Sequence, residues 1–99
     1  MVNIEDKEIN QYFISIVMML ASACWQQLGK VPSPVSNKIE KDCASAKVTI
    51  DILEMLRDKT KGNLSPDEEK MLGNTIADLQ INYADEVNKP EIKPEEKKN

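Results

Sequence analysis

The sequence predicts an all-α fold of three helices, in which a long antiparallel helical hairpin packs with a third helix. Apolar residues recur at steps of three and four along three segments, which is the period of helices that bury one face. Glycine and proline separate these segments, where such residues commonly begin or end helices. Strand signals are weak, because the β-branched residues of 48–50 lie inside a longer helical period. The 99 residues suit a single domain.

The first helix is expected over about residues 4–28. Glu5 and Asp6 lie in its first turn, where the positive end of the helix dipole favours acidic side chains. Gly29 follows the helix at the position where glycine commonly closes one, and Pro32 comes shortly after.

The second helix is expected over about residues 36–61. Pro32 and Pro34 exclude ordinary helix interior before it, because proline lacks a backbone N–H. Gly62 then stops the helix. The candidates for its N-cap, between which the sequence does not decide, are Ser33, Ser36 and Asn37.

The third helix is expected over residues 66–87, and its start is the clearest local signal in the chain. Ser65 is an N-cap, Pro66 suits the first helical position, and Glu68 completes a capping box. This helix has a single apolar stripe, made of Leu72, Ile76, Leu79 and Tyr83. It therefore predicts an outer helix with one solvated side.

The folded domain is expected to span residues 1–87. Residues 88–99 contain two prolines, alternating charges and one large apolar side chain. Such a segment buries too little apolar surface to order itself, so we expect a disordered charged tail.

The first two helices each carry apolar residues on opposite sides. On the first helix, one side holds Ile9, Tyr12, Phe13, Ile16, Leu20, Ala23 and Gln27, and the other holds Ile14, Met18, Ala21 and Trp25. On the second helix, one stripe holds Ile39, Cys43, Ala46, Ile50 and Leu53, and the other holds Ala44, Val48, Ile52, Met55 and Leu56. Lys47 and Asp51 lie between these stripes, four residues apart, and can form an ion pair.

A helix on the surface of a monomer needs one apolar stripe, so a second stripe indicates a second partner. We expect self-association into a homodimer or larger homo-oligomeric bundle. The predicted interface comprises Ile14, Met18, Ala21, Trp25, Val48, Ile52 and Met55. The alternatives are a monomer that wraps a broad apolar arc inward, another protein as partner, or a membrane surface.

The composition offers little chemistry. The chain has no His, which removes the usual general base and the commonest metal ligand. Its two cysteines, Cys24 and Cys43, lack the CxxC spacing of a redox motif and are too few for a structural zinc site. We therefore expect no catalytic residues, no metal site and no cofactor, and we expect that the protein is not an enzyme.

Charge and hydropathy indicate which kinds of partner and which cellular location to expect. A net charge of −4 argues against nucleic acid as a partner. The longest apolar run, residues 13–25, is shorter than the roughly 20 residues that span a bilayer, which argues against a membrane protein. The polar, acidic residues 3–8 do not look like a signal peptide, so a cytoplasmic location is expected.

These observations favour a non-enzymatic, self-associating interaction or scaffold module. Two other functions stay open. The second apolar stripes could rest on a membrane surface, although such helices usually carry Lys and Arg on their polar side. A small-ligand binder or enzyme could instead form its pocket between helices.

Three segments resemble a known family. These are FISIVMMLASACWQQLG at 13–29, AKVTIDILEMLRDKTKGNLS at 46–65 and LQINY at 79–83, and the string KTKGNL at 59–64 is the most specific part. Together they resemble the small bacterial family of unknown function that is numbered 1844. The resemblance implies a soluble, all-helical bacterial protein, and it implies no activity, ligand or catalytic residue.

Overall fold

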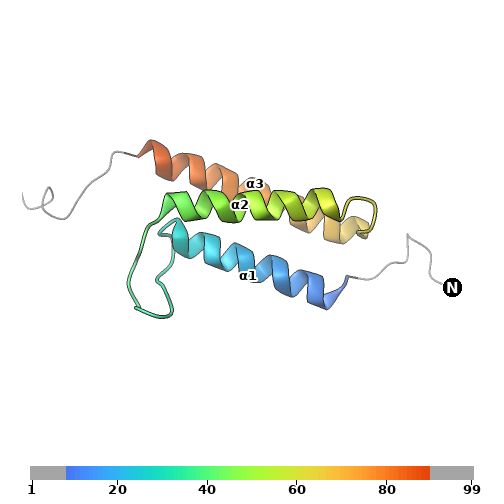
Figure 1. Cartoon of the computed structure of the whole chain (residues 1–99), viewed down its shortest axis with the longest axis horizontal. Helices are drawn as coiled ribbons and strands as arrows, with labels where there is room; N and C mark the ends of the chain where they lie inside the picture. The colour runs from blue at the N-terminus through green and yellow to red at the C-terminus, as the bar shows by residue number, and fades with distance from the viewer. Residues whose placement is uncertain (1–8, 90–99) are drawn as a thin grey trace, which may run out of the picture.

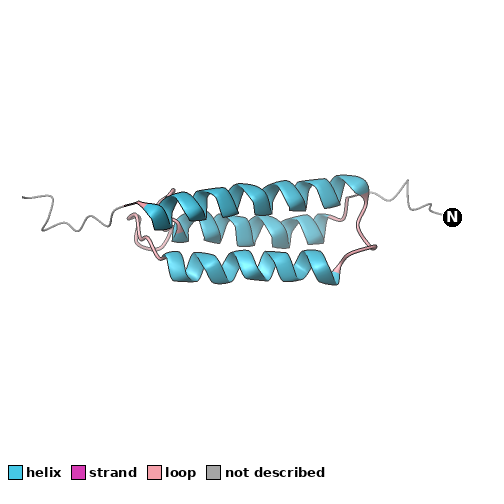
Figure 2. Ribbon diagram, turned by 90° about the horizontal axis from the view of Figure 1, so that it is seen from above, coloured by secondary structure: helices cyan, strands magenta, loops and turns pink. Residues whose placement is uncertain are grey.

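A computed structural model describes residues 9–89, which form three helices. They are α1 (Gln11–Gln27), α2 (Cys43–Lys59) and α3 (Pro66–Asn88). Consecutive helices run antiparallel and lie side by side along the length of the molecule (Figure 1, Figure 2). The predicted all-α fold, with a helical hairpin followed by a third helix, is confirmed for this part of the chain.

Helix α1 begins later than predicted. Asn10 has an extended backbone, and its side chain accepts a hydrogen bond from the Phe13 N–H at 3.0 Å, so it is the N-cap. The predicted start near residue 4 is wrong, because Ile9 and Asn10 are not helical. The predicted first-turn acids, Glu5 and Asp6, lie outside the described residues.

The end of α1 confirms the role predicted for Gly29. Its φ of +80° is left-handed, a region that glycine enters without a Cβ penalty. The Gly29 N–H donates to the Gln26 carbonyl at 2.9 Å, and the Lys30 N–H donates to the Trp25 carbonyl at 2.9 Å. This pair of bonds is the Schellman motif, and it satisfies carbonyls that the helix end leaves free.

Helix α2 also begins later than predicted, at Cys43 instead of residue 36. Asp42 is its N-cap, since its carboxylate accepts from the Ser45 N–H at 3.1 Å and from the Ser45 hydroxyl at 2.7 Å. Asn37, one of the predicted caps, has a left-handed φ of +62° inside the connection. None of the three predicted caps therefore begins this helix. It ends at Lys59, two residues before the predicted end, with Thr60 as its cap, and Gly62 follows with a φ of +88° as the predicted stop.

Helix α3 confirms the predicted capping box. The Ser65 hydroxyl accepts from the Glu68 N–H at 3.2 Å, and the Glu68 carboxylate accepts from the Ser65 N–H at 2.8 Å. The helix ends at Asn88, one residue beyond the predicted end. The rest of the predicted tail lies outside the described residues from residue 90 onward.

The core lies between the three helices. Its buried apolar residues are Val17, Ala21, Cys24, Leu28, Ala46, Ile50, Leu53, Leu72, Ile76 and Leu79. The stripe predicted for α3 is confirmed, because three of its members are fully buried and Tyr83 packs against the core. Both cysteines are free thiols, and burial raises the pKa of Cys24 to about 11.

Candidate interaction surface

Helix α1 is the least charged element of the chain. Its 17 residues include no Asp, Glu, Lys or Arg, although 30% of the whole sequence is charged. A helix at the surface of a small protein normally carries charged side chains on its solvated side. The outer side of α1 is therefore the first place to look for a binding surface.

The structure corrects the predicted interface on α1. Ala21 is buried in the chain's own core, and Trp25 packs against that core. Ile14 is half-buried, and only Met18 is clearly exposed. The core-facing side of α1 runs along Val17 and Ala21, so the predicted stripe of Ile14, Met18, Ala21 and Trp25 is partly used inside the monomer.

Besides Met18, three further apolar residues of α1 are exposed, and they lie elsewhere on the helix. Tyr12, Ile16 and Met19 follow each other at steps of four and three, and their exposed fractions are 83%, 49% and 69%. Tyr12 and Ile16 belong to the stripe that the sequence placed on the other side of the helix. Phe13 and Leu20 of the same stripe pack against the core, so only part of that side faces solvent.

Helix α2 has a matching exposed stripe, as predicted. Val48, Ile52 and Met55 recur at steps of four and three, and all three are exposed. Three of the five members of the opposite predicted stripe, Ala46, Ile50 and Leu53, belong to the core. Of the other two, Cys43 is half-buried and Ile39 is exposed and lies before the helix. The two-sided character predicted for this helix is confirmed.

Hydrogen bonds between helices show that the two exposed stripes share one side of the molecule. Gln27 continues the exposed stripe of α1, and its side chain accepts from the Thr49 hydroxyl of α2 at 2.7 Å. On the other flank of α2, the Glu54 carboxylate accepts from the Gln80 side chain of α3. On a helical wheel with 100° per residue, Ile52 lies closer to Thr49, which faces α1, than to Glu54, which faces α3. The exposed stripe of α2 therefore lies beside α1.

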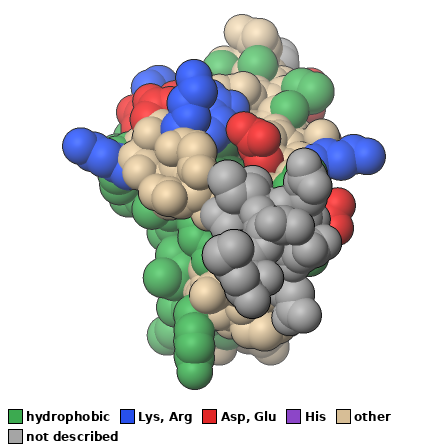
Figure 3. Space-filling view, turned by 90° about the vertical axis from the view of Figure 1, so that its right-hand side faces the viewer, with side chains coloured by type: hydrophobic (Ala, Val, Ile, Leu, Met, Phe, Trp, Pro, Cys, Tyr) green, Lys and Arg blue, Asp and Glu red, His purple; other side chains and the backbone are tan. Residues whose placement is uncertain are grey.

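We call this surface the apolar face and define it by Tyr12, Ile16, Met19, Val48, Ile52 and Met55. The end-on view in Figure 3 shows hydrophobic side chains gathered along one side of the molecule, with charged side chains across its upper part. The predicted ion pair between Lys47 and Asp51 borders the face on α2, with 2.9 Å between Nζ and Oδ2. The sequence predicted the α2 half of the apolar face and missed its α1 half.

A charged cluster that the sequence did not predict lies at the end of the bundle where α1 and α3 finish. Glu86 is buried, and its carboxylate contacts Lys30 at 2.5 Å, Lys41 at 2.8 Å and Lys89 at 2.9 Å. The hydrogen bonds from Lys30, Lys41 and Lys89 hold the pKa of Glu86 far below its usual value. The cluster joins α3 to the connection between α1 and α2, and its geometry is that of a structural ion-pair network.

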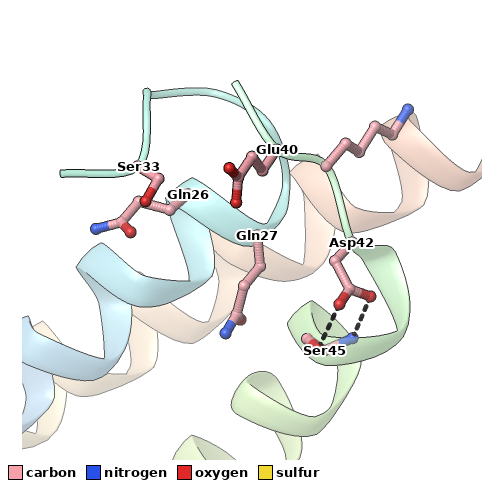
Figure 4. A pocket seen from close by; sticks show the side chains of 7 residues that line it. Gln26, Gln27, Ser33, Glu40, Asp42 and Ser45 are labelled. Atoms are coloured by element: carbon pink, nitrogen blue, oxygen red, sulfur yellow. Dashed lines mark hydrogen bonds between the residues drawn. The ribbon is translucent and has the colours of Figure 1, made fainter. Parts of the chain in front are cut away.

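A shallow cavity of about 430 Å³ opens beside that connection (Figure 4). Its lining residues are Gln26, Gln27, Ser33, Glu40, Lys41, Asp42 and Ser45. Asp42 points to Ser45 and is already engaged as the cap of α2, and these bonds lower its pKa. The Ser45 hydroxyl and the Asp42 carboxylate, which meet in this cavity, form the cap of α2. The residues 9–89 contain no group of three His, Cys, Asp or Glu side chains that could hold a metal ion.

The family model for "Domain of unknown function (DUF1844)" matches residues 10–85, most of the chain. The protein belongs to the DUF1844 family. This confirms the resemblance seen in the sequence. The matched region of this DUF1844 protein contains all six residues of the apolar face and ends one residue before Glu86.

No curated protein and no solved structure is significantly similar to this DUF1844 chain. None of the three helices described in residues 9–89 has both the length and the apolar character to cross a membrane.

Proposed function

We propose that this DUF1844 protein is a non-enzymatic interaction module that binds protein through the apolar face. The observation that carries the proposal is the exposure of six large apolar side chains on one side of α1 and α2. Monomeric soluble proteins rarely expose contiguous apolar patches larger than a few hundred Å², and larger patches mark interaction sites.

Energetics support the same proposal. Burying one large aliphatic or aromatic side chain contributes about 1.5–3 kcal/mol, so covering six partly exposed ones drives association before its entropic cost is subtracted. Tyr12 and Met19 are the most exposed members, and they gain most from being covered. Aromatic residues and methionine are also the types enriched at protein interfaces.

A membrane surface fits the apolar face less well than a protein. Helices that lie on membranes carry Lys and Arg along their polar side, which attract anionic lipid. The polar side of α1 carries Ser15, Ser22 and Gln26 instead. The cavity beside the connection offers no comparable support for a ligand binder, because Asp42, one of the two acidic side chains that line it, already serves as a helix cap.

Site-specific photocross-linking inside the protein's native cell tests this proposal. A photoreactive amino acid at Met19 should give a cross-linked protein product, whose composition is read by mass spectrometry. The same amino acid at Asn74, exposed on α3, should give none. Equal products at both positions, or cross-linking of Met19 to lipid alone, would contradict the proposal.

A further inference from the structure

We infer that the partner on the apolar face is a second copy of this chain, related by a two-fold axis, so that α1 and α2 of both copies form a four-helix bundle. The inference rests on the proposed function, because it uses the same face and names its occupant. Four observations carry it: the shape of the face, its charge, its area and the position of its central residues.

The shape of the face suits its own copy. The face extends over two antiparallel helices of equal length, each of 17 residues. Two such hairpins pack face to face with their axes about 20° from parallel, which is the arrangement of four-helix bundles. A two-fold contact of this kind uses the same patch on both copies and is therefore closed.

The charge of the face allows identical surfaces to meet. Each chain has a net charge of −4, so the overall charge opposes association of two copies, least where the contacting surfaces carry few charges. Helix α1 contributes no charged residue, and Lys47 and Asp51 at the border on α2 neutralise each other. A second copy thus meets this face without like-charge repulsion.

The area of the face supplies up to about half of what a stable dimer needs. A large apolar side chain presents roughly 60–120 Å² when its burial is converted at about 25 cal/mol per Å², and because the six side chains are only 37% to 83% exposed, together they present on the order of 200–400 Å². Standard interfaces bury about 800 Å² per partner, including a polar rim. Ser15, Ser22 and Gln26 lie beside the α1 stripe and can supply such a rim.

The central residues of the face set the position of the axis. Met19 is the middle residue of α1, and Ile52 lies within one residue of the middle of α2. A two-fold axis through the centre of the face passes near both of them. Each would therefore contact the other copy at the most enclosed part of the interface, where side chains contribute most to binding.

Light scattering on a sizing column, over a wide range of concentration, tests the inference with three proteins. The natural chain should have twice the 11.2 kDa mass of one chain. The double variant Met19→Glu, Ile52→Glu should have the mass of one chain, with its dissociation constant raised by more than about tenfold. The matched control Ile81→Glu changes an exposed isoleucine on α3 and should remain a dimer.

Circular dichroism checks that each variant keeps its helices. If the double variant loses helicity, Met19→Glu alone replaces it, since this side chain is 69% exposed in the monomer. A natural chain that has the mass of one copy at every concentration overturns the inference, and so does a dimer that survives the charge substitutions. In either case, cross-linking of Met19 to a different protein would still support the proposed function. If Met19 gave no protein cross-link, the proposed function would be rejected together with the dimer.

Discussion

Glu86 is a buried carboxylate that three lysines from three parts of the chain surround. Lys30 follows α1, Lys41 precedes α2, and Lys89 follows α3. Lys41 also donates to the Glu86 backbone carbonyl at 3.4 Å. Because several charge-assisted hydrogen bonds converge on one buried group, this residue fixes the helix ends more strongly than an isolated surface ion pair would.

Replacing Glu86 with Gln should lower the free energy of unfolding at neutral pH by about 1.5–3 kcal/mol, the range for hydrogen bonds to charged groups. The folded state lowers the pKa of Glu86 below its ordinary 4.5, so the stabilisation is present above about pH 4.5 and is lost as the pH falls toward the folded-state value. Urea unfolding from pH 7 to pH 2 should therefore show the natural chain and the variant converging in acid.

The matched control is Asp78→Asn, which removes an exposed acid from α3 and should change stability by less than about 0.5 kcal/mol. A difference between the natural chain and Glu86→Gln that stays constant across this pH range would contradict the role given to the carboxylate.

At the scale of helices, two glycines with different backbone conformations have different roles. Gly29 has a φ of +80°, and a Cβ there would lie 3.2 Å from the Lys41 Cβ. Gly73 lies inside α3, where a Cβ would meet no atom within 4 Å. The first glycine is required by the turn that follows α1, and the second only costs α3 conformational entropy.

We therefore expect opposite effects from one substitution at the two sites. Gly73→Ala should stabilise the protein by about 0.5–1 kcal/mol, because alanine favours the helix. Gly29→Ala should destabilise it by about 1 kcal/mol or more, because alanine resists a positive φ. Thermal unfolding of both variants and of the natural chain measures whether each substitution raises or lowers stability. If both substitutions changed stability in the same direction, the backbone conformation of the glycine would not control the change.

Helix ends could be predicted from the sequence where several local signals coincide. Ser65, Pro66 and Glu68 together determine the start of α3, and Gly29 and Gly62 end the two preceding helices. The start of α2 could not be predicted, because serines, an asparagine and an aspartate, all of which can cap a helix, occur before it. The Asp42 carboxylate caps the helix by accepting hydrogen bonds from both the amide and the hydroxyl of Ser45, three residues later. Ser33 is followed by Ser36 at the same spacing, so this pattern alone does not select Asp42.

The candidate surface was predictable on one helix only. On α2, charged residues separate the two stripes, so periodicity identifies Val48, Ile52 and Met55 as a second side. On α1, apolar residues cover most of the circumference, and periodicity does not show which of them face inward. Val17 and Cys24 lay in neither predicted stripe of α1, yet both are fully buried. The core contributed by α2 and α3 sets the orientation of α1.

At the scale of the whole molecule, a small core coexists with a large uncovered apolar surface. Ten apolar side chains form the buried core of the described residues, and six large apolar side chains remain exposed on the apolar face. A domain of about this length is marginally stable when its own core is the only source of stability. Covering the apolar face would therefore add a substantial fraction to the stability of the fold.

For this reason we expect the thermal unfolding temperature to depend on protein concentration. A dimer that unfolds to single chains gains stability by mass action, about 2.7 kcal/mol per dimer for a hundredfold rise in concentration, which should raise Tm by several degrees. Scanning calorimetry or fluorescence over that range measures the rise. The Tm of the Met19→Glu, Ile52→Glu variant should not change with protein concentration. If the Tm of the natural chain did not change either, the natural chain would unfold as a monomer.

Glu68 has a role in folding order that goes beyond its capping box. One of its carboxylate oxygens accepts from Ser65, three residues away, and the other accepts from the Asn10 N–H at 2.6 Å, across 58 residues of sequence. The first bond can form as soon as α3 nucleates, whereas the second requires closure of a loop that contains all of α1 and α2. This bond couples the opening turns of α1 and α3, because loosening one turn removes a hydrogen bond from the other and so favours the opening of both.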